Sequence, residues 1–239
     1  MSAARDALAK AESIDGYRAA CKASALNSAA REGDLYIPYS IDRADVNRLN
    51  KQIFSIELMG DVDIVVLHPS ADNGYPHTRP NNIVCMPTNA IQGVSDSALA
   101  DTLRHEAVHI HQRRNPEQWV GACLHEGWWP VQSHQIPQRF AERCRLNPDT
   151  MGDRQFWAWQ THYVPLPMFI REDVPTMEGV QVKWMDLRNN TLSSEPPSSF
   201  KARYGANPSQ PEHPYELLAV ESAAAGISTV GALHSKLTQ

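Results

Sequence analysis

The segment 95–114 constrains the fold of this chain more than any other. Its apolar residues recur at helical spacing and so mark one side of a helix, which is the case for Leu99, Leu103 and Ile110. Ser95 or Asp96 can cap the start, because short polar side chains accept a hydrogen bond from the free amides of a first turn. Pro116 ends the helix, because the residue before a proline avoids the helical conformation. The rest of the chain must therefore build a core along one side of this helix.

Inside this helix lies the sequence His105-Glu106-Ala107-Val108-His109. Residues four apart project from the same face of a helix about one turn apart, so both imidazoles can bind one metal ion. The carboxylate of Glu106 lies beside them. It can take a proton from a water molecule that zinc has made more acidic. The pattern therefore indicates hydrolysis by a metal-activated water with a glutamate as general base.

This motif resembles the HExxH zinc signature of the zincin metallopeptidases. The resemblance covers residues 95–115 and extends to the last helix of the chain. It implies an α+β, zincin-like fold in which a small β-sheet lies over the active-site helix. It also implies one catalytic Zn²⁺, bound by His105 and His109, and hydrolysis of a peptide or amide bond. The metzincin continuation is missing, since Gln112 and Asn115 stand where that pattern has Gly and a third His.

The third zinc ligand must then be a more distant carboxylate, as in the gluzincins, and two residues compete. Glu216 begins the sequence Glu-Leu-Leu-Ala on a late helix, which resembles the E-x-x-A ligand helix of several gluzincins. Glu126 precedes Gly127 and resembles the ligand segment of another gluzincin branch. Pro130 and Pro137 leave little room for a helix there. We expect Glu216 to be the ligand and keep Glu126 as the alternative.

Several polar residues are candidates for supporting roles. A metal-binding histidine usually donates its second N–H to an outer carboxylate or carbonyl, and the candidates for this role are Glu221, Asp101 and Asp63. A peptidase also needs a donor that stabilises the oxyanion of the transition state. The candidates for that role are Tyr204, Tyr215 and Tyr163.

The remaining sequence divides into four predicted parts of one metallopeptidase-like domain, residues 1–239. Residues 1–54 form an Ala-rich helical part, and residues 55–115 hold short strands at 56–59, 62–67 and 83–86 followed by the active-site helix. Residues 116–211 combine all six tryptophans with many prolines and predict a long irregular insertion. Residues 212–239 contain the C-terminal ligand helix, with Pro214 at its start and Gly226 at its end.

Composition limits the function classes. The formal net charge is −5, so the basic surface that nucleic-acid binding requires is missing, and we expect no nucleic-acid partner. The sequence has neither an unbroken apolar span of membrane length nor a secretory signal. Four widely spaced cysteines indicate a reducing compartment. We therefore expect a cytoplasmic or otherwise intracellular protein without a membrane span.

Taken together, the sequence predicts a zinc-dependent hydrolase, a metallopeptidase that acts on a peptide or protein substrate. The alternative is a non-catalytic protein, either a zincin-fold binding module or one with a structural zinc. A structural zinc site is closed by four protein ligands, whereas a catalytic site keeps one position open. A third possibility is a deformylase-like amidase with a cysteine ligand upstream of the helix. Cys85 lies upstream but lacks the surrounding motif of that family.

Overall fold

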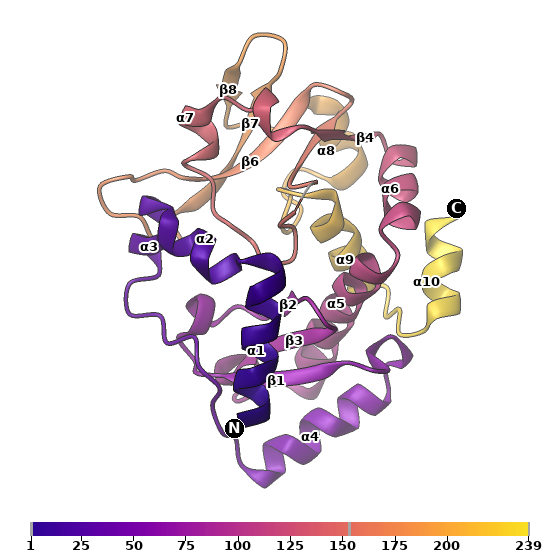
Figure 1. Ribbon diagram of the computed structural model, residues 1–239. Helices are drawn as coiled ribbons and strands as arrows, with labels where there is room; N and C mark the ends of the chain where they lie inside the picture. Colours follow the sequence, from indigo (N-terminus) through magenta and orange to yellow (C-terminus); the bar gives the residue numbers. More distant parts are fainter. Residues whose placement is uncertain (1, 153, 239) are drawn as a thin grey trace. The chain divides into compact units, whose positions relative to one another are not determined.

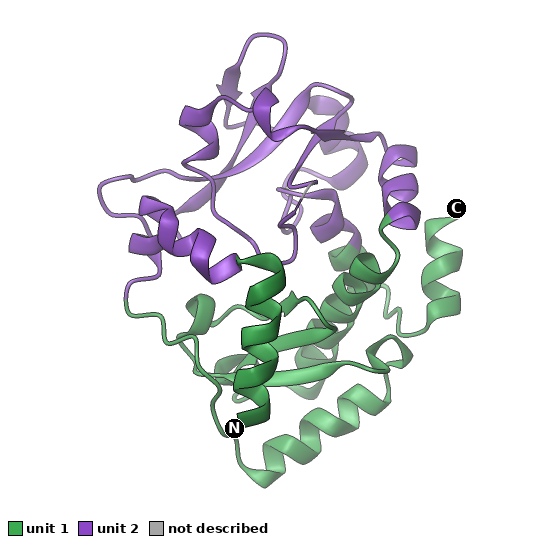
Figure 2. Cartoon of the chain, viewed as in Figure 1, with its two compact units in different colours: residues 1–16, 33–116, 219–239 green, residues 17–32, 117–218 purple. Residues whose placement is uncertain are grey.

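In a computed structural model, which describes residues 2–152 and 154–238, the chain has an α+β fold with two small sheets (Figure 1). Met1, Asp153 and Gln239, which the predicted ranges include, lie outside the described residues. The chain divides into two compact units (Figure 2). The first unit comprises the residues up to Gly16, then Gly33–Pro116, and the residues from Ala219 on; the second comprises Tyr17–Glu32 and Glu117–Leu218. Among the described residues, no helix is both long and apolar enough to cross a membrane.

The first unit is built around a three-stranded sheet of order β1-β3-β2, in which β3 pairs parallel with β1 and antiparallel with β2. Its elements are α1 (Ser2–Asp15), α4 (Arg43–Phe54), the 3₁₀ turns Glu57–Met59, Ala71–Gly74 and Thr88–Ala90, β1 (Asp63–Leu67), β2 (His77–Arg79), β3 (Ile83–Pro87), α5 (Asp96–Arg114) and α10 (Val230–Leu237). Helix α9 (Pro214–Ala224) starts in the second unit and continues into the first.

Alternation along the strands decides which residues of this sheet meet α1. Successive side chains of a strand point to opposite faces, and one face carries Val65, Leu67, Ile83 and Cys85. Helix α1 packs on this face through its apolar side, and it crosses β1 and β3 in Figure 1. The residues that point the other way on β3 are fully buried as well, so both faces of the sheet are covered.

The predicted strand at 56–59 was wrong, because this segment forms the 3₁₀ turn Glu57–Met59. Leu58 and Met59 are buried, and the turn packs against α4 and α5. The amide of Leu58 donates to the carbonyl of Ser228 and not to a neighbouring strand. These apolar side chains therefore pack against helices. A run of four residues does not by itself distinguish such packing from a buried strand.

The second unit contains an antiparallel sheet of five strands, so the prediction of an irregular segment at 116–211 was also wrong. The strands follow one another in the order β4-β5-β6-β7-β8. The elements are α2 (Tyr17–Ala23), α3 (Ala25–Ala30), α6 (Pro116–His125), β4 (Trp128–Val131), the 3₁₀ turn Ser133–Gln135, α7 (Gln138–Ala141), β5 (Phe156–Trp159), β6 (Tyr163–Phe169), β7 (Val180–Asp186), β8 (Thr191–Ser193) and α8 (Ser198–Tyr204).

Prolines concealed this sheet from the sequence. Pro165 and Pro167 lie on β6, which pairs along its whole length with β7 but with β5 only at Tyr163. Beyond Tyr163, the described chain bonds to this side of β6 through residues 143–145, by an isolated bridge and two backbone hydrogen bonds. A proline is tolerated on such a side because it removes no regular ladder hydrogen bond. The number of prolines alone therefore predicts an irregular segment, although these residues form a β-strand.

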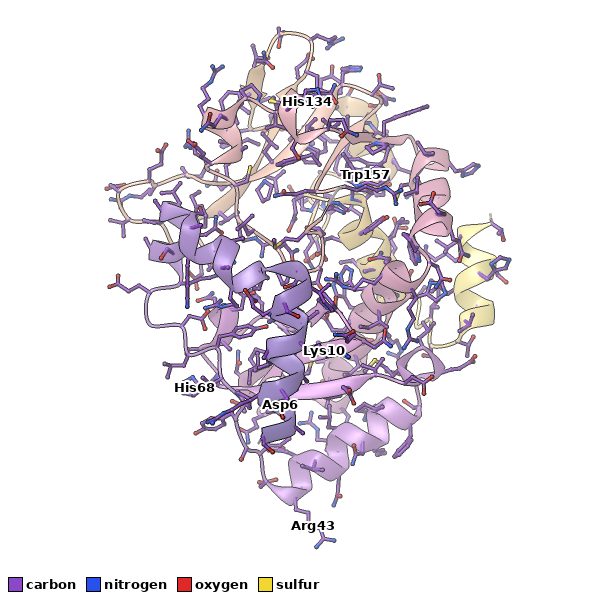
Figure 3. The ribbon with its side chains drawn as sticks, viewed as in Figure 1. Asp6, Lys10, Arg43, His68, His134 and Trp157 are labelled. Atoms are coloured by element: carbon purple, nitrogen blue, oxygen red, sulfur yellow. The ribbon has the colours of Figure 1, made fainter. Side chains whose placement is uncertain are left out.

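Aromatic residues form one layer of this second unit. The side chains that point to one face of the sheet include Trp128, Trp159 and Trp184, and α8 covers them with Phe200 and Tyr204. Trp157, labelled in Figure 3, has the same orientation on β5 and is 1% exposed. The opposite face packs aliphatic residues against Phe140 of α7. These tryptophans are therefore core residues of the second unit.

Candidate metal centre

Helix α5 is held at both ends. At its start, Ser95 Oγ accepts a hydrogen bond from the amide of Ala98 at 3.1 Å, as the sequence predicts for one of its two cap candidates. Arg48 donates to Asp96 at 2.7 Å and ties α4 to this first turn. Near the end, Arg113 donates to Thr78 Oγ1 of β2 at 3.0 Å. The 19-residue helix is thus a rigid support for the motif in its middle.

The helical spacing brings the two motif histidines together. The Nε2 atoms of His105 and His109 are 3.0 Å apart, and the ring planes are inclined at 77°. Two nitrogens at about 2.0–2.1 Å from one tetrahedral zinc ion would lie roughly 3.3 Å apart. The observed separation is therefore close to what a shared metal ion requires.

Glu216 joins these two histidines. It occupies the first turn of α9, where Pro214 starts the helix and a negative side chain is favoured by the helix dipole. One potential ligand atom from each of His105, His109 and Glu216 lies within 4.8 Å of the other two. The structure thus brings together the three residues that the sequence analysis selects as ligands.

The donor set fits a zinc ion. Glu216 and His109 are each 1% exposed, and a buried carboxylate is costly unless it is paired or binds a metal. Two imidazole nitrogens and one carboxylate oxygen form a donor set found in catalytic zinc sites. The group could hold a metal ion, and zinc as its identity stays a prediction.

Two neutral side chains contact the candidate ligands. Gln112 lies on α5 one turn after His109, and its Oε1 is 2.7 Å from His109 Nδ1. A hydrogen bond donated by Nδ1 leaves the Nε2 lone pair of His109 available for a metal. Asn147 donates from Nδ2 to Glu216 Oε1 at 2.6 Å. Sequence reasoning missed both residues, although the i, i+3 spacing of His109 and Gln112 was a usable signal.

A half-buried ion pair lies on the same part of the chain as Glu216. Arg145 donates to Glu212 at 2.8 Å. Burial raises the pKa of Glu212, Arg145 opposes that rise, and the neighbouring charge of Glu216 adds to it. The positive charge of Arg145 is therefore paired with Glu212. The hydrogen bond to Glu216 Oε1 comes from the neutral side chain of Asn147.

Glu126, the alternative third ligand, lies elsewhere. It follows α6, and its Oε2 accepts a hydrogen bond from Arg203 Nε at 2.7 Å. Tyr204 contacts the same oxygen at 3.4 Å. Among the described residues, Glu126 is not part of the candidate metal group. Its observed environment is that of a carboxylate paired with an arginine near the surface.

Glu106, the predicted general base, is on α5 and is 3% exposed. It follows His105 directly, so the helix holds its Cα next to the metal-binding face. Glu106 does not belong to the candidate ligand group itself, which is consistent with a residue that acts on water and does not bind the metal.

The supporting roles predicted from sequence meet mixed outcomes. His109 Nδ1 faces Gln112. Of the three predicted carboxylates, Asp101 pairs with Arg104 and Glu221 contacts Lys236. Of the three tyrosines, Tyr204 accepts from Trp128 and Tyr163 accepts from Arg188. Tyr215 precedes Glu216, and burial raises its pKa to about 12. No described contact assigns any of them to oxyanion stabilisation.

Cys85, the residue considered for an amidase-like site, is fully buried on β3 and belongs to the core beneath α1. Its sulfur lies 3.5 Å from the hydroxyl of Tyr36. Within the described part of the chain it does not belong to the candidate metal group. The cysteine of the amidase alternative therefore has a packing role here.

Comparisons with family models, with curated proteins and with solved structures gave no match for this chain.

Proposed function

We propose that this protein is a zinc-dependent hydrolase, and specifically a metallopeptidase of the zincin type, gluzincin-like in its ligands. The observation that carries the proposal is the convergence of His105, His109 and Glu216, whose potential ligand atoms lie within 4.8 Å of one another. Two of these residues flank a buried glutamate on the same helix. This is the minimum set that metal-assisted hydrolysis needs.

A bound zinc ion would polarise the substrate carbonyl and make water a better nucleophile. Glu106 would accept the proton of the attacking water and then give it to the leaving amine. Gln112 would keep His109 in the tautomer that leaves Nε2 free for metal binding. Asn147 would orient the carboxylate of Glu216 by its hydrogen bond to Oε1.

The non-catalytic alternative is less well supported. A structural zinc needs four protein ligands, whereas the candidate group has three members in the described residues. A general base such as Glu106 also has no use in a structural site. The three-ligand set supports an open coordination position and therefore a catalytic role.

The metal is tested by elemental analysis of the purified protein beside His109→Ala, Glu216→Ala and Glu126→Ala. We expect one zinc per chain in the wild type and in Glu126→Ala, and loss of zinc in the other two variants. Zinc retained in Glu216→Ala but lost in Glu126→Ala would move the third ligand to Glu126. No zinc in the wild type after incubation with zinc salts would refute the proposed function.

Catalysis is tested with Glu106→Gln and a library of unstructured peptide substrates. Replacing a general base removes about 10²–10⁴-fold of the rate, and the variant should still bind one zinc because Glu106 is not a ligand. Full activity in Glu106→Gln would exclude the mechanism. Zinc binding without cleavage of any peptide by the wild type would favour the binding-module alternative.

A further inference from the structure

We propose that Asn147 is a positioning residue for the carboxylate of Glu216, and that α2 and α3 hold Asn147 in place for this role. The inference rests on the proposed metal site and concerns residues of the second unit only. Asn147 is 9% exposed and donates to Glu216 Oε1 at 2.6 Å. Through this bond the N-terminal helices would influence metal affinity although they contain no ligand.

The orientation of the Asn147 amide follows from its second contact. Its Oδ1 accepts a hydrogen bond from the backbone amide of Asp149 at 3.0 Å, the short-range pattern of an Asx turn. Because the oxygen is engaged there, the NH₂ end of the amide faces Glu216. The contact is therefore a donor–acceptor pair, and Asn147 cannot turn its amide without losing both bonds.

The hydrogen bond from Asn147 orients the carboxylate that Glu216 can offer a metal ion. A carboxylate has two oxygens, and the hydrogen bond from Asn147 engages Oε1. An amide donor carries no formal charge, so it orients the carboxylate without competing electrostatically with a bound cation. Glu216 is thereby prepared to bind a metal mainly through Oε2, in one defined direction.

The segment that carries Asn147 is held by side chains. Residues 145–147 belong to no helix or strand, so their backbone groups need other partners. Asn27 of α3 accepts from the amide of Leu146 at 2.9 Å and donates to the carbonyl of Cys144 at 2.9 Å. Arg31 donates to the carbonyl of Leu146 at 2.9 Å.

Asn27 and Arg31, the two side chains that hold this segment, are themselves buried and hydrogen-bonded to each other. Asn27 is 1% exposed and Arg31 is 7% exposed. Arg31 also donates to Asn27 Oδ1 at 2.9 Å and to the hydroxyl of Tyr17 on α2 at 3.1 Å. Removing Asn27 would leave the backbone next to Asn147 without two of its partners, so Asn147 would lose its fixed position.

The test measures zinc affinity by competition with a chromophoric chelator, on the full chain, for Asn147→Asp and Asn147→Ala. Loss of an outer partner of a ligand costs about 10–100-fold in metal affinity, and we expect both variants to fall in this range. Asn27→Ala should lose about tenfold, the lower end of that range. The matched control is Asn189→Asp, because Asn189 Oδ1 accepts from the amide of Thr191 in the same kind of turn at an exposed hairpin.

Two further readouts separate positioning from general stability. Co²⁺ in place of zinc should give a visible absorption spectrum of changed intensity in Asn147→Asp, because the spectrum reports ligand geometry, and an unchanged spectrum in Asn189→Asp. The zinc affinity of Asn147→Ala should also stay reduced at a temperature where circular dichroism shows that variant fully folded, because the effect acts through the orientation of Glu216 and not through unfolding. If Asn147→Asp fails to fold, Asn147→Ala provides the same comparison.

If both Asn147 variants bind zinc with wild-type affinity, the positioning role of Asn147 is overturned. The proposed function stands in that case, because the wild type still binds zinc. Wild-type affinity in Asn147→Ala at a temperature where that variant is fully folded would also overturn the positioning role. Unchanged affinity in Asn27→Ala, at a temperature where that variant is folded, would remove the N-terminal helices from the proposal. Absence of zinc binding in the wild type would instead be a failure of the proposed function.

Discussion

The hydrogen bond between His109 and Gln112 makes a quantitative prediction about the candidate site. The two atoms are 2.7 Å apart, and the residues are 1% and 2% exposed. Gln112→Leu keeps the approximate volume but removes the acceptor, so His109 Nδ1 loses this partner in the interior. An unsatisfied buried donor costs about 1–3 kcal/mol, and we expect the metal-free protein to be destabilised by this amount.

The effect on zinc binding adds to this loss. Removing the acceptor should weaken zinc binding about 10–100-fold. At a zinc concentration of about 1,000 times the wild-type Kd, bound zinc stabilises the wild type by about 4.1 kcal/mol. The same concentration would stabilise Gln112→Leu by only about 1.4–2.7 kcal/mol. For a chain of this size about 1 kcal/mol corresponds to about 2–4 °C in Tm.

The assay is thermal unfolding followed by circular dichroism, with and without zinc. The zinc-induced rise in Tm should be smaller in Gln112→Leu than in the wild type by about 3–10 °C. Gln112→Glu is the control, because its carboxylate can still accept the Nδ1 hydrogen bond and should preserve the zinc effect. An equal zinc-induced rise in Gln112→Leu and the wild type would refute the reasoning, whatever the stability of the metal-free protein.

Three further predictions concern the frame of the site. Leu103→Ala, at a fully buried position of α5, should lower the free energy of unfolding in urea by about 2–5 kcal/mol; a loss below about 1 kcal/mol would contradict the packing described for this helix. Arg79→Met should cost about 3–5 kcal/mol in the same assay, because it leaves Asp15 and Glu12, bound at 2.6 and 2.7 Å, without their buried partner. Burial raises the pKa of Cys144 to about 12, so its thiol should resist a disulfide reagent at pH 8 until urea unfolds the chain. Because the folded pKa lies above the unfolded one, stability from keeping this thiol protonated is present below about pH 9 and is lost as the pH rises toward about 12; a urea midpoint that is constant over this range would contradict it.

The features predicted correctly from sequence are those that local spacing determines. The helix 95–114, its Ser95 cap and the facing of His105 and His109 follow from helical geometry within one segment. The strands at 62–67 and 83–86 and the start of α9 at Pro214 also carry strong local signals, although α10 (Val230–Leu237) follows the helix that the sequence predicted to be the last. The α+β class follows from these elements.

The features missed are those that depend on partners distant in the chain. The five-stranded sheet of the second unit was hidden because prolines on β6 face a side with little strand pairing, which no local pattern reveals. The segment 56–59 has an apolar run that suits a strand, but contact with α5 and Ser228 decides for a turn. In both cases tertiary contacts override local preference.

The candidate metal site shows the same division within one group of atoms. The sequence by itself determined the two histidines and the glutamate between them, because all three lie within five residues of one helix. The sequence narrowed the candidates for the third ligand to Glu216 and Glu126 but could not decide between them by distance. Only the tertiary structure brings Glu216 to the histidines and pairs Glu126 with Arg203, since a distance across more than a hundred residues is set by packing and not by spacing along the chain.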